Sequence, residues 1–281
     1  MKTNMAHRNY RWPDGVTLEL GERTLIMGIL NITPDSFSDG GRYTAVEEAV
    51  EQARRMAAAG ADLIDIGGES TRPGSTAVPL EEELRRILPV VTALREALPE
   101  LPLSIDTYKA ETARAALAAG AHIINDVWGL KYDGEMAAVA AEYGCPVILS
   151  HNRQARDYQS LVPDVIADLR ESIALAEAAG VSEEKIWLDP GIGFAKNYED
   201  NLELLGALTE LTTLGYPVLL GTSRKRFIQQ TLGLPASEVV MGTAATVVMG
   251  IMQGCQLVRV HDVEAIFQTA RMTDRVVYRQ S

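Results

Sequence analysis

The chain contains little cysteine. Only Cys145 and Cys255 occur among its 281 residues, and neither stands in a spacing that is typical of a metal site or a redox pair. We therefore interpret both as small core residues of a protein that works in a reducing compartment.

Long apolar runs and an excess of positive charge are also missing. No apolar run reaches membrane-spanning length, and residues 1–12 lack the apolar core of a signal peptide, so we expect a soluble cytoplasmic protein with no membrane partner. The formal net charge of −12 leaves no basic stripe for phosphate backbones, so we expect no nucleic-acid partner. A small anionic substrate is still allowed where positive charge is gathered locally.

Short apolar runs alternate with helical patterns along the whole chain. With 281 residues and 47% hydrophobic residues, the chain is long enough for one β/α barrel. We predict eight strands, each followed by a helix, with glycine ending several helices. Residues 16–20 are predicted as one arm of a hairpin that closes the bottom of the barrel. The expected strands are 25–30, 63–66, 102–105, 122–124, 146–150, 186–188, 217–220 and 257–260; the expected helices are 45–59, 79–97, 109–119, 134–143, 161–179, 199–211, 224–232, 238–253 and 263–276.

A closed barrel is favoured over an open sheet. Strands that are so continuously apolar suit a parallel sheet covered on both faces. No glycine-rich dinucleotide fingerprint follows the first strand, which counts against the open fold. Because no linker, low-complexity tract or change in composition divides the chain, the prediction is an α/β protein. It is a single (β/α)8 TIM barrel domain over residues 1–281 with a short N-terminal β-hairpin.

Polar side chains stand at the carboxyl ends of the predicted strands. In a barrel these ends meet around one mouth, so residues far apart in the sequence become neighbours. Asp189 ends the apolar run 186–188 just before Pro190, and burying its charge requires a cationic or hydrogen-bonding partner. The other strand-end residues are Asn31, Asp65, Asp106, Asn125, His151, Ser223, Arg259 and His261.

Each of these residues also has an ordinary structural interpretation. Asp189 could cap a turn, Asn125 could cap a helix, and Ser223 could cap a helix that begins at Arg224. A single histidine such as His151 is more often structural than catalytic. These interpretations would have to hold independently at every strand end, so we favour a binding site at the mouth.

Two sets of opposite charge indicate the chemistry of the ligand. Asp106, Asp189 and the amide of Asn125 suit a flat heterocycle with an amidine-like edge, whose N–H groups they would accept. Arg259 and His261 stand two residues apart at the last strand end and therefore on one face.

A cationic run, 223–226 (SRKR), precedes the helix after the seventh strand. Loops after the last two strands of a barrel, together with a helix N-terminus, form a familiar phosphate site. We expect at least one of Arg224 and Arg226 to lie at a solvated helix start instead.

Seven segments in order resemble the dihydropteroate synthase family. They are MGILNITPDSFSDGG (27–41), DIGGESTRPG (65–74), SIDTYK (104–109), IINDV (123–127), LDPGIGFAK (188–196), LLGTSRK (219–225) and RVHD (259–262). They cover nearly the whole chain, and two of them are long and unusual. The resemblance implies a barrel transferase of folate synthesis that joins 4-aminobenzoate to 6-hydroxymethyl-7,8-dihydropterin diphosphate and releases diphosphate, with Mg²⁺ as cofactor.

The same resemblance implies a role for each matching residue. The pterin ring would be held by Asp106, Asn125, Asp189, Lys225 and a stacked Arg259. The diphosphate would be bound by Arg259, His261 and Asn31, the last acting as the ligand of the metal ion. The aminobenzoate site would include Phe37, Thr71, Pro73, Phe194 and Ser223. Asp39 and Arg72 would order two loops over the reacting centre, and the residues expected to be catalytic are Asp39, Arg72, Asp106, Asp189 and Lys225.

One position departs from the family pattern. The family has Leu-Met-His after the fifth strand, whereas this chain has Leu149-Ser150-His151, and the smaller Ser150 would loosen or reshape the pterin pocket. The loop 32–41 carries no insertion beside Phe37, so we expect ordinary sensitivity to sulfonamide inhibitors. The resemblance also implies a homodimer through the last helices. The apolar stretch Val239–Met252 suits that interface, and it suits a core-facing helix equally well.

Two other functions match parts of the pattern. A folate or corrinoid methyltransferase of the same superfamily would share the acidic pterin pocket, but it would have less use for the TPDSFSDGG loop and the Ser-Arg-Lys cluster. A pterin-binding protein without catalysis would be expected to lose some of Asn31, Asp39, Arg72, Lys225 and Arg259, and all five are present. We therefore expect the synthase reaction.

Overall fold

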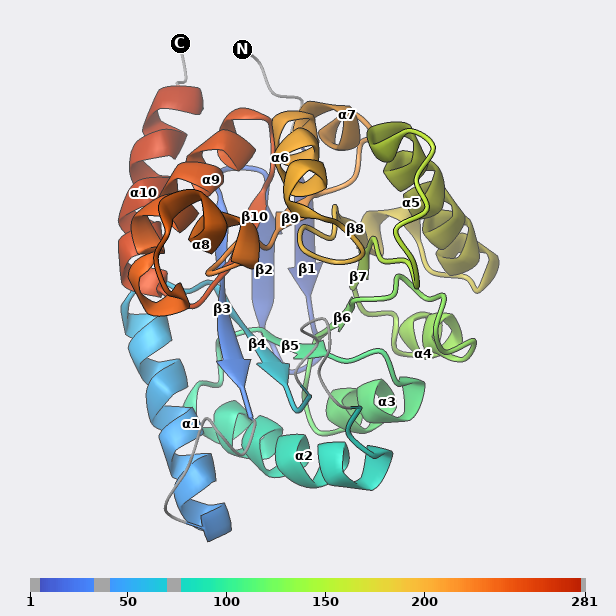
Figure 1. The fold of residues 1–281 in the computed structure, drawn as a ribbon. Coiled ribbons are helices and arrows are strands. Elements are labelled where there is room, and N and C mark those ends of the chain that lie inside the picture. Colours follow the sequence, from blue (N-terminus) through green and yellow to red (C-terminus); the bar gives the residue numbers. More distant parts are fainter. Residues whose placement is uncertain (1–5, 33–40, 70–76, 279–281) are drawn as a thin grey trace.

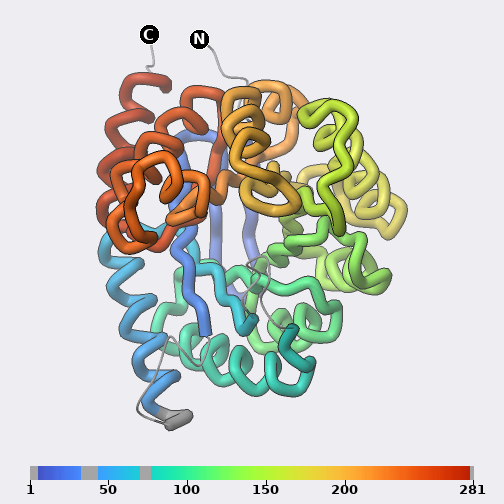
Figure 2. The backbone as a smooth tube through the Cα atoms, in the orientation of Figure 1, coloured from blue at the N-terminus to red at the C-terminus, as the bar shows by residue number. Residues whose placement is uncertain are grey.

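The computed structural model describes residues 6–32, 41–69 and 77–278. A ring of parallel strands forms the centre of the molecule, and helices surround it (Figure 1). Figure 2 shows the chain circling the ring, so that the last helix returns to the side on which the first one lies. The predicted (β/α)8 barrel is confirmed.

The barrel wall consists of parallel strands that begin and end close to the predicted positions. The eight-stranded sheet has the order β8-β7-β6-β5-β4-β3-β10-β9, and a parallel bridge between Leu188 and Val218 joins its two edges. Within the described residues the strands are β3 (Leu25–Asn31), β4 (Leu63–Gly67), β5 (Leu103–Asp106), β6 (Ile123–Asp126), β7 (Val147–Ser150), β8 (Ile186–Asp189), β9 (Leu219–Leu220) and β10 (Leu257–Val260).

The helices follow the strands in the predicted alternation. They are α1 (Gly41–Ala58), α2 (Leu80–Ala97), α3 (Ala110–Ala118), α4 (Met136–Tyr143), α5 (Leu161–Ala178), α6 (Tyr198–Gly206), α7 (Leu208–Thr212), α8 (Arg226–Leu232), α9 (Val240–Met252) and α10 (Val263–Val277). In addition, short 3₁₀ turns cover Glu183–Lys185 and Ala236–Glu238.

One predicted helix was wrong in its extent. The pattern over 199–211 indicated a single helix, but the chain forms α6 and α7 with a break at Ala207, whose φ and ψ of −113° and 17° are not helical. The break lets Leu208 and Leu211 both point into the core, where they are fully buried.

Alternate residues of each strand face different environments. In β3, for example, Ile26 and Leu30 pack outward against the helices, whereas Leu25 and Met27 belong to a second apolar cluster inside the barrel. This inner cluster also contains Trp187, which is fully buried.

An antiparallel hairpin of β1 (Arg8–Arg11) and β2 (Thr17–Leu20) packs on this inner cluster. Leu18 and Leu20 belong to the cluster, and Trp187 Nε1 donates to Tyr10 Oη at 2.8 Å. The hairpin therefore closes the end of the barrel opposite the strands' carboxyl ends, as predicted from residues 16–20.

Two further expectations concern the core and the surface. Cys145 and Cys255 are both buried free thiols, which confirms their interpretation as core residues. Over the described part of the chain, no helix has the length and apolar character to cross a membrane.

Candidate active site

The strand register places predicted site residues side by side at the mouth. Asn31 of β3 pairs with Gly67 of β4, Gly67 pairs with Asp106 of β5, and Asp106 pairs with Asn125 of β6. The missing side chain of Gly67 leaves open space in this row: a Cβ there would lie 3.6 Å from Asn31 Oδ1 and from Asp106 Oδ2. The four positions form a continuous polar rim although they are dispersed in the sequence.

Arg259 crosses the mouth from β10 to this rim. Its Nε donates to Asp65 Oδ2 at 2.6 Å, and its Nη2 donates to Asp106 Oδ2 at 2.7 Å. Asn125 Nδ2 also donates to Asp65 Oδ2, at 3.0 Å. Asp65 is completely buried and thus anchors two predicted pterin-binding residues at once.

Asp65 was not assigned a role from the sequence, although it was recognised as a strand-end residue. The missed signal is its place inside the apolar strand LIDIG, where a buried carboxylate requires a cationic partner. Its Oδ1 is buried and accepts no hydrogen bond from the residues the structure describes.

Burial and charge set the protonation of this side of the mouth. Burial raises the pKa of Asp106 to about 7, although the cation of Arg259 works in the opposite direction. Burial alone would lower the pKa of Arg259, but the carboxylates of Asp65 and Asp106 outweigh it and raise that pKa above its usual value. Arg259 therefore stays charged, while Asp106 can exchange a proton near neutrality.

Asp189 and Lys225 form the opposite side of the mouth. Asp189 Oδ1 accepts a hydrogen bond of 2.7 Å from the backbone N–H of Gly191. Lys225 Nζ donates to the carbonyl of Ile192 and lies 4.5 Å from the centroid of the Phe194 ring. Burial raises the pKa of Asp189 and lowers the pKa of Lys225 to about 8, so the two charges face each other in a poorly solvated site.

Ser223 does not cap a helix. Its Oγ lies 2.9 Å from His261 Nδ1 and accepts from the His261 N–H at 3.1 Å, so two predicted site residues contact each other directly. The helix expected from Arg224 begins two residues later, at Arg226, because Arg224 has a left-handed φ of 57°.

The two neighbouring arginines differ in their surroundings. Arg224 is tied to Asp262 by two hydrogen bonds, of 2.5 and 3.0 Å. Arg226 is exposed at the start of α8, which confirms the expectation that at least one of them marks a solvated helix start.

His151 is buried and has protein partners on both ring nitrogens. Its Nε2 lies 2.9 Å from Asp168 Oδ2, and its Nδ1 lies 2.8 Å from Lys196 Nζ. Burial, followed by the charge of Lys196, lowers the pKa of His151 to about 3, so the ring is neutral. Among the described residues the ring therefore contacts protein side chains, Asp168 and Lys196, on both nitrogens.

Several expected site residues lie outside the part of the chain that the structure describes. They are Phe37, Thr71, Pro73, Asp39 and Arg72. Their roles stay predictions from the resemblance.

The donor set suits a metal ion bound mainly through the substrate. Among the described residues, no group of three His, Cys, Asp or Glu side chains could hold a metal ion. Mg²⁺ commonly binds through one or two protein oxygens together with substrate phosphates and water. The Oδ1 of Asn31 at the open rim position beside Gly67 is an oxygen donor of that kind.

Comparisons with known proteins agree with this geometry. A family described as "Pterin binding enzyme" matches residues 27–261. The chain is 54% identical to the dihydropteroate synthase of Bacillus subtilis over 260 residues, which is 92% of this chain and 91% of that protein.

Two solved structures are also similar. The dihydropteroate synthase of Clostridium difficile, determined in the presence of pteroic acid, has a TM-score of 0.91 and 48% identity over 94% of this chain and all of that one. The enzyme of Xanthomonas albilineans in complex with 7,8-dihydropteroate has a TM-score of 0.85 and 44% identity, and the match covers 92% of this chain and 95% of that one. The chain therefore belongs to the pterin-binding enzyme family and, within it, to the dihydropteroate synthases.

Proposed function

We propose that the mouth of the barrel condenses 6-hydroxymethyl-7,8-dihydropterin diphosphate with 4-aminobenzoate to give 7,8-dihydropteroate and diphosphate. The observation that carries this proposal is the buried pairing of acceptors and cations: Asp106, Asn125 and Asp189 face Arg259 and Lys225 across the mouth. The likeness to the Xanthomonas albilineans enzyme with bound 7,8-dihydropteroate supports the choice of substrates.

The pterin ring would bind between the two sides of the mouth. Its amidine-like edge presents N–H donors to the carboxylates of Asp106 and Asp189, in charge-assisted hydrogen bonds that are stronger in a poorly solvated site. Lys225 would donate to the ring, and Arg259, held by Asp65 and Asp106, would stack on its face.

The reaction transfers the pterin methylene group to an aryl amine. The C–O bond to the diphosphate breaks and its electron pair leaves with the diphosphate, while the amine nitrogen forms the new C–N bond and loses a proton. Arg259 and His261, which contacts Ser223, would bind the leaving diphosphate. When bound through Asn31, Mg²⁺ would supply further neutralisation of the diphosphate charge.

The aminobenzoate would bind beside Phe194 and Ser223, near Lys225. The ring of Phe194, which lies against Lys225, would give it an apolar wall. Sulfonamides resemble 4-aminobenzoate in size and shape, so we propose that they compete for this position with ordinary affinity. Inhibition constants far weaker than the KM for 4-aminobenzoate would contradict this.

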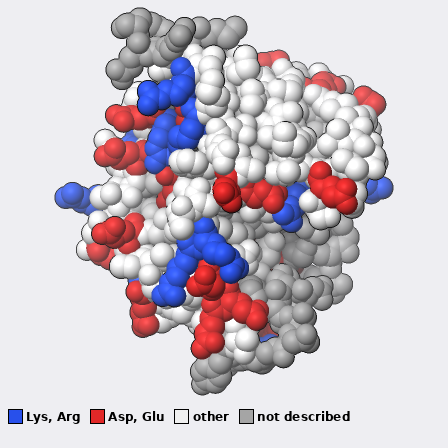
Figure 3. Space-filling model, turned by 90° about the vertical axis from the view of Figure 1, so that its left-hand side faces the viewer, with Lys and Arg blue, Asp and Glu red and all other residues white. Residues whose placement is uncertain are grey.

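We also propose a homodimer formed through α9 and α10. These helices pack against each other and still expose large apolar side chains, including Met241 at 77% and Met272 at 68%. Figure 3 faces this side and shows a broad area with few charged residues over the upper centre and right of the molecule. Large apolar side chains exposed together on one face are typical of an interface. Sedimentation at micromolar concentration would test this assembly.

A cytoplasmic location is part of the same proposal. The two buried cysteines are free thiols, which is the usual state in a reducing compartment.

The decisive experiment is diphosphate release by the purified protein with Mg²⁺ and dihydropterin diphosphate, with and without 4-aminobenzoate. We expect release that depends on both substrates, with dihydropteroate formed. Tight pterin binding without turnover would support a binding protein instead. Absence of pterin binding would contradict the assignment of the mouth as a pterin site.

A further inference from the structure

The segment 190–197, between β8 and α6, carries two contacts of the site. The carbonyl of Ile192 accepts from Lys225 Nζ, and the Phe194 ring lies against the same ammonium group. The segment thus shapes the position assigned to the aryl amine, whereas Asp189, at the end of β8, belongs to the strand before it.

The backbone of this segment is unusual. Gly191, Gly193 and Ala195 have left-handed φ values of 67°, 88° and 50°. Glycine adopts such values easily, but a residue with a Cβ loses about 1–2 kcal/mol there. The segment therefore needs contacts that hold it in this conformation.

Lys196 supplies those contacts. Its Nζ donates to the carbonyls of Gly191 and Phe194, both at 3.0 Å, and lies 2.8 Å from His151 Nδ1. All three ammonium hydrogens are thereby directed at acceptors, and none of the three acceptors is charged. Within the described residues no ion pair joins Lys196 to a carboxylate, and burial lowers its pKa to about 7, so its Nζ acts as a hydrogen-bond donor to the backbone of its own segment.

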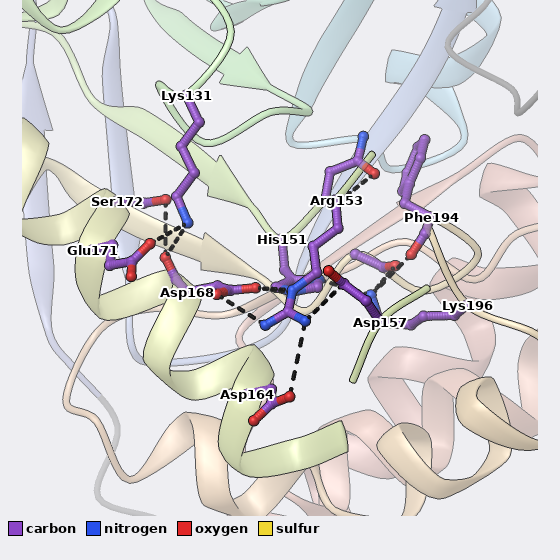
Figure 4. A network of polar contacts seen from close by, with 12 residues as sticks. Lys131, His151, Arg153, Asp157, Asp164, Asp168, Glu171, Ser172, Phe194 and Lys196 are labelled. Carbon is purple, nitrogen blue, oxygen red and sulfur yellow. Dashed lines mark hydrogen bonds and ion pairs between the residues drawn. The ribbon is translucent and has the colours of Figure 1, made fainter. Parts of the chain in front are cut away.

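His151 fixes the direction of the Lys196 side chain. Because the ring is neutral, its Nε2–H donates to Asp168 and its Nδ1 accepts from Lys196. Asp168 is held in turn by Arg153, whose Nε and Nη2 donate to it at 2.6 and 3.2 Å. Figure 4 shows this chain of contacts, which runs from helix α5 through His151 to Lys196.

The contacts of Asp189 do not use the Lys196 side chain. The His151 N–H donates to the Asp189 carbonyl at 2.9 Å, and the Asp189 carboxylate is bound by the Gly191 N–H. Close packing also matters here, because a Cβ on Gly191 would lie 1.8 Å from the His151 carbonyl oxygen. None of these contacts involves the Lys196 ammonium group, so we expect them to persist when it is removed.

We propose that Lys196, oriented by His151, is a positioning residue for the aryl amine: it holds segment 190–197 in the conformation that sets Phe194 and the Ile192 carbonyl against Lys225. This inference rests on the proposed function, since it assigns Phe194 to the 4-aminobenzoate site. It predicts that loss of the ammonium group affects one substrate far more than the other.

The test is Lys196→Met, which keeps the length of the side chain and removes its donors. We expect the KM for 4-aminobenzoate to rise about tenfold, because the aryl pocket is no longer set, while the KM for dihydropterin diphosphate changes by less than about threefold. Lys196→Gln keeps an N–H₂ donor and should give a smaller rise in the same direction. It also serves as the second variant if Lys196→Met does not fold.

Lys131→Met is the matched control. Lys131 donates to the Asp168 carbonyl at 2.9 Å and pairs with Glu171 at 3.0 Å, on the far side of the same network from the segment. The Lys131→Met variant should leave both KM values unchanged within about twofold, even if its thermal stability falls.

The outcomes separate this inference from the proposed function. Wild-type protein that forms no dihydropteroate contradicts the proposed function itself. If wild-type protein turns over but Lys196→Met and Lys196→Gln lower only kcat, or raise both KM values equally, then Lys196 is merely structural and the inference is wrong. The inference is supported if both Lys196 variants selectively raise the KM for 4-aminobenzoate and Lys131→Met does not.

Discussion

The two ends of the barrel are filled by opposite kinds of side chains. At the bottom, Leu18, Leu20 and Trp187 pack together, and the hairpin covers them. At the mouth, Asp106 and Asp189 are buried at the ends of their strands and Asp65 inside its own, and Arg259 and Lys225 offset their charge.

This difference in side-chain character separates the end of the barrel that stabilises the fold from the end to which we assign activity. Burying apolar groups at the bottom stabilises the fold, at about 25 cal/mol per Å² removed from water. Burying carboxylates at the mouth costs free energy that ion pairs recover only in part, and the proposed function accounts for this cost, because the charges would bind the substrate. Mutations at the two ends should therefore separate turnover from stability.

The largest effect is expected for Asp189→Asn at the mouth. Turnover should fall about 10²- to 10³-fold, since a charged acceptor for the pterin is lost. The raised pKa of Asp189 means that its charge is disfavoured in the fold, so thermal unfolding should be unchanged or occur at slightly higher temperature. Steady-state kinetics and calorimetry check both parts. Activity near that of wild type would show that Asp189 does not have this role.

Leu20→Ala at the bottom should have the converse effect. Leu20 is 2% exposed, and its truncation should lower the free energy of unfolding by about 3 kcal/mol through lost burial and a new cavity. Below the new melting temperature, kcat/KM should stay within about twofold of wild type, because the mouth is unaffected. Urea titration and steady-state kinetics, both at about 25 °C, provide the measurement. A selective loss of pterin affinity would mean that the two ends are coupled.

The pH dependence should report the charges of the mouth. Asp106 must be ionised to accept from the pterin, so kcat/KM should fall as pH drops below its pKa of about 7. Lys225 must be protonated to donate, so kcat/KM should also fall above its pKa of about 8. Lys225→Arg should remove the alkaline limb and leave the acid limb. A flat profile across both values would exclude these assignments.

The raised pKa of Asp106 affects stability in the opposite direction to activity: ionisation of Asp106 is needed for activity but lowers stability. The pKa of Asp106 is raised in the fold from its ordinary value of 3.8 to about 7. Its contribution to stability is therefore complete below 3.8 and is lost as pH rises through about 7. Asp106→Asn should flatten that part of the stability profile.

The smallest effect is expected for Ser150→Met. Ser150 lies beside Asp189 in the sheet and is buried, and the larger side chain restores the residue of the family pattern to the pterin wall. Pterin affinity should rise about two- to fivefold through added apolar contact, with thermal stability nearly constant. Isothermal titration with a pterin ligand would check this. Weaker binding would show that the pocket has already adapted to serine.

The sequence alone determined the architecture and most of the rim. Apolar runs ended by polar residues, and helices ended by glycine, are local patterns, so strands such as 25–30 and the closing hairpin were predicted close to their observed positions. Asn31, Asp106, Asn125 and Arg259 were identified because the carboxyl ends of parallel strands must meet in a barrel. The local sequence pattern did not predict the helix break at Ala207 or the left-handed backbone conformation of Arg224, since both depend on the residues that pack against them.

Only the tertiary structure decided which polar groups are partners. Asp65 and Arg259 are 194 residues apart, and their contact depends on the register of several strands and on closure of the ring. The same holds for Lys196, which reaches His151 across 45 residues. A sequence pattern specifies which face a side chain occupies, but burial and the pairing of charges arise only when distant segments come together, because electrostatic interactions depend on distance and solvent exclusion.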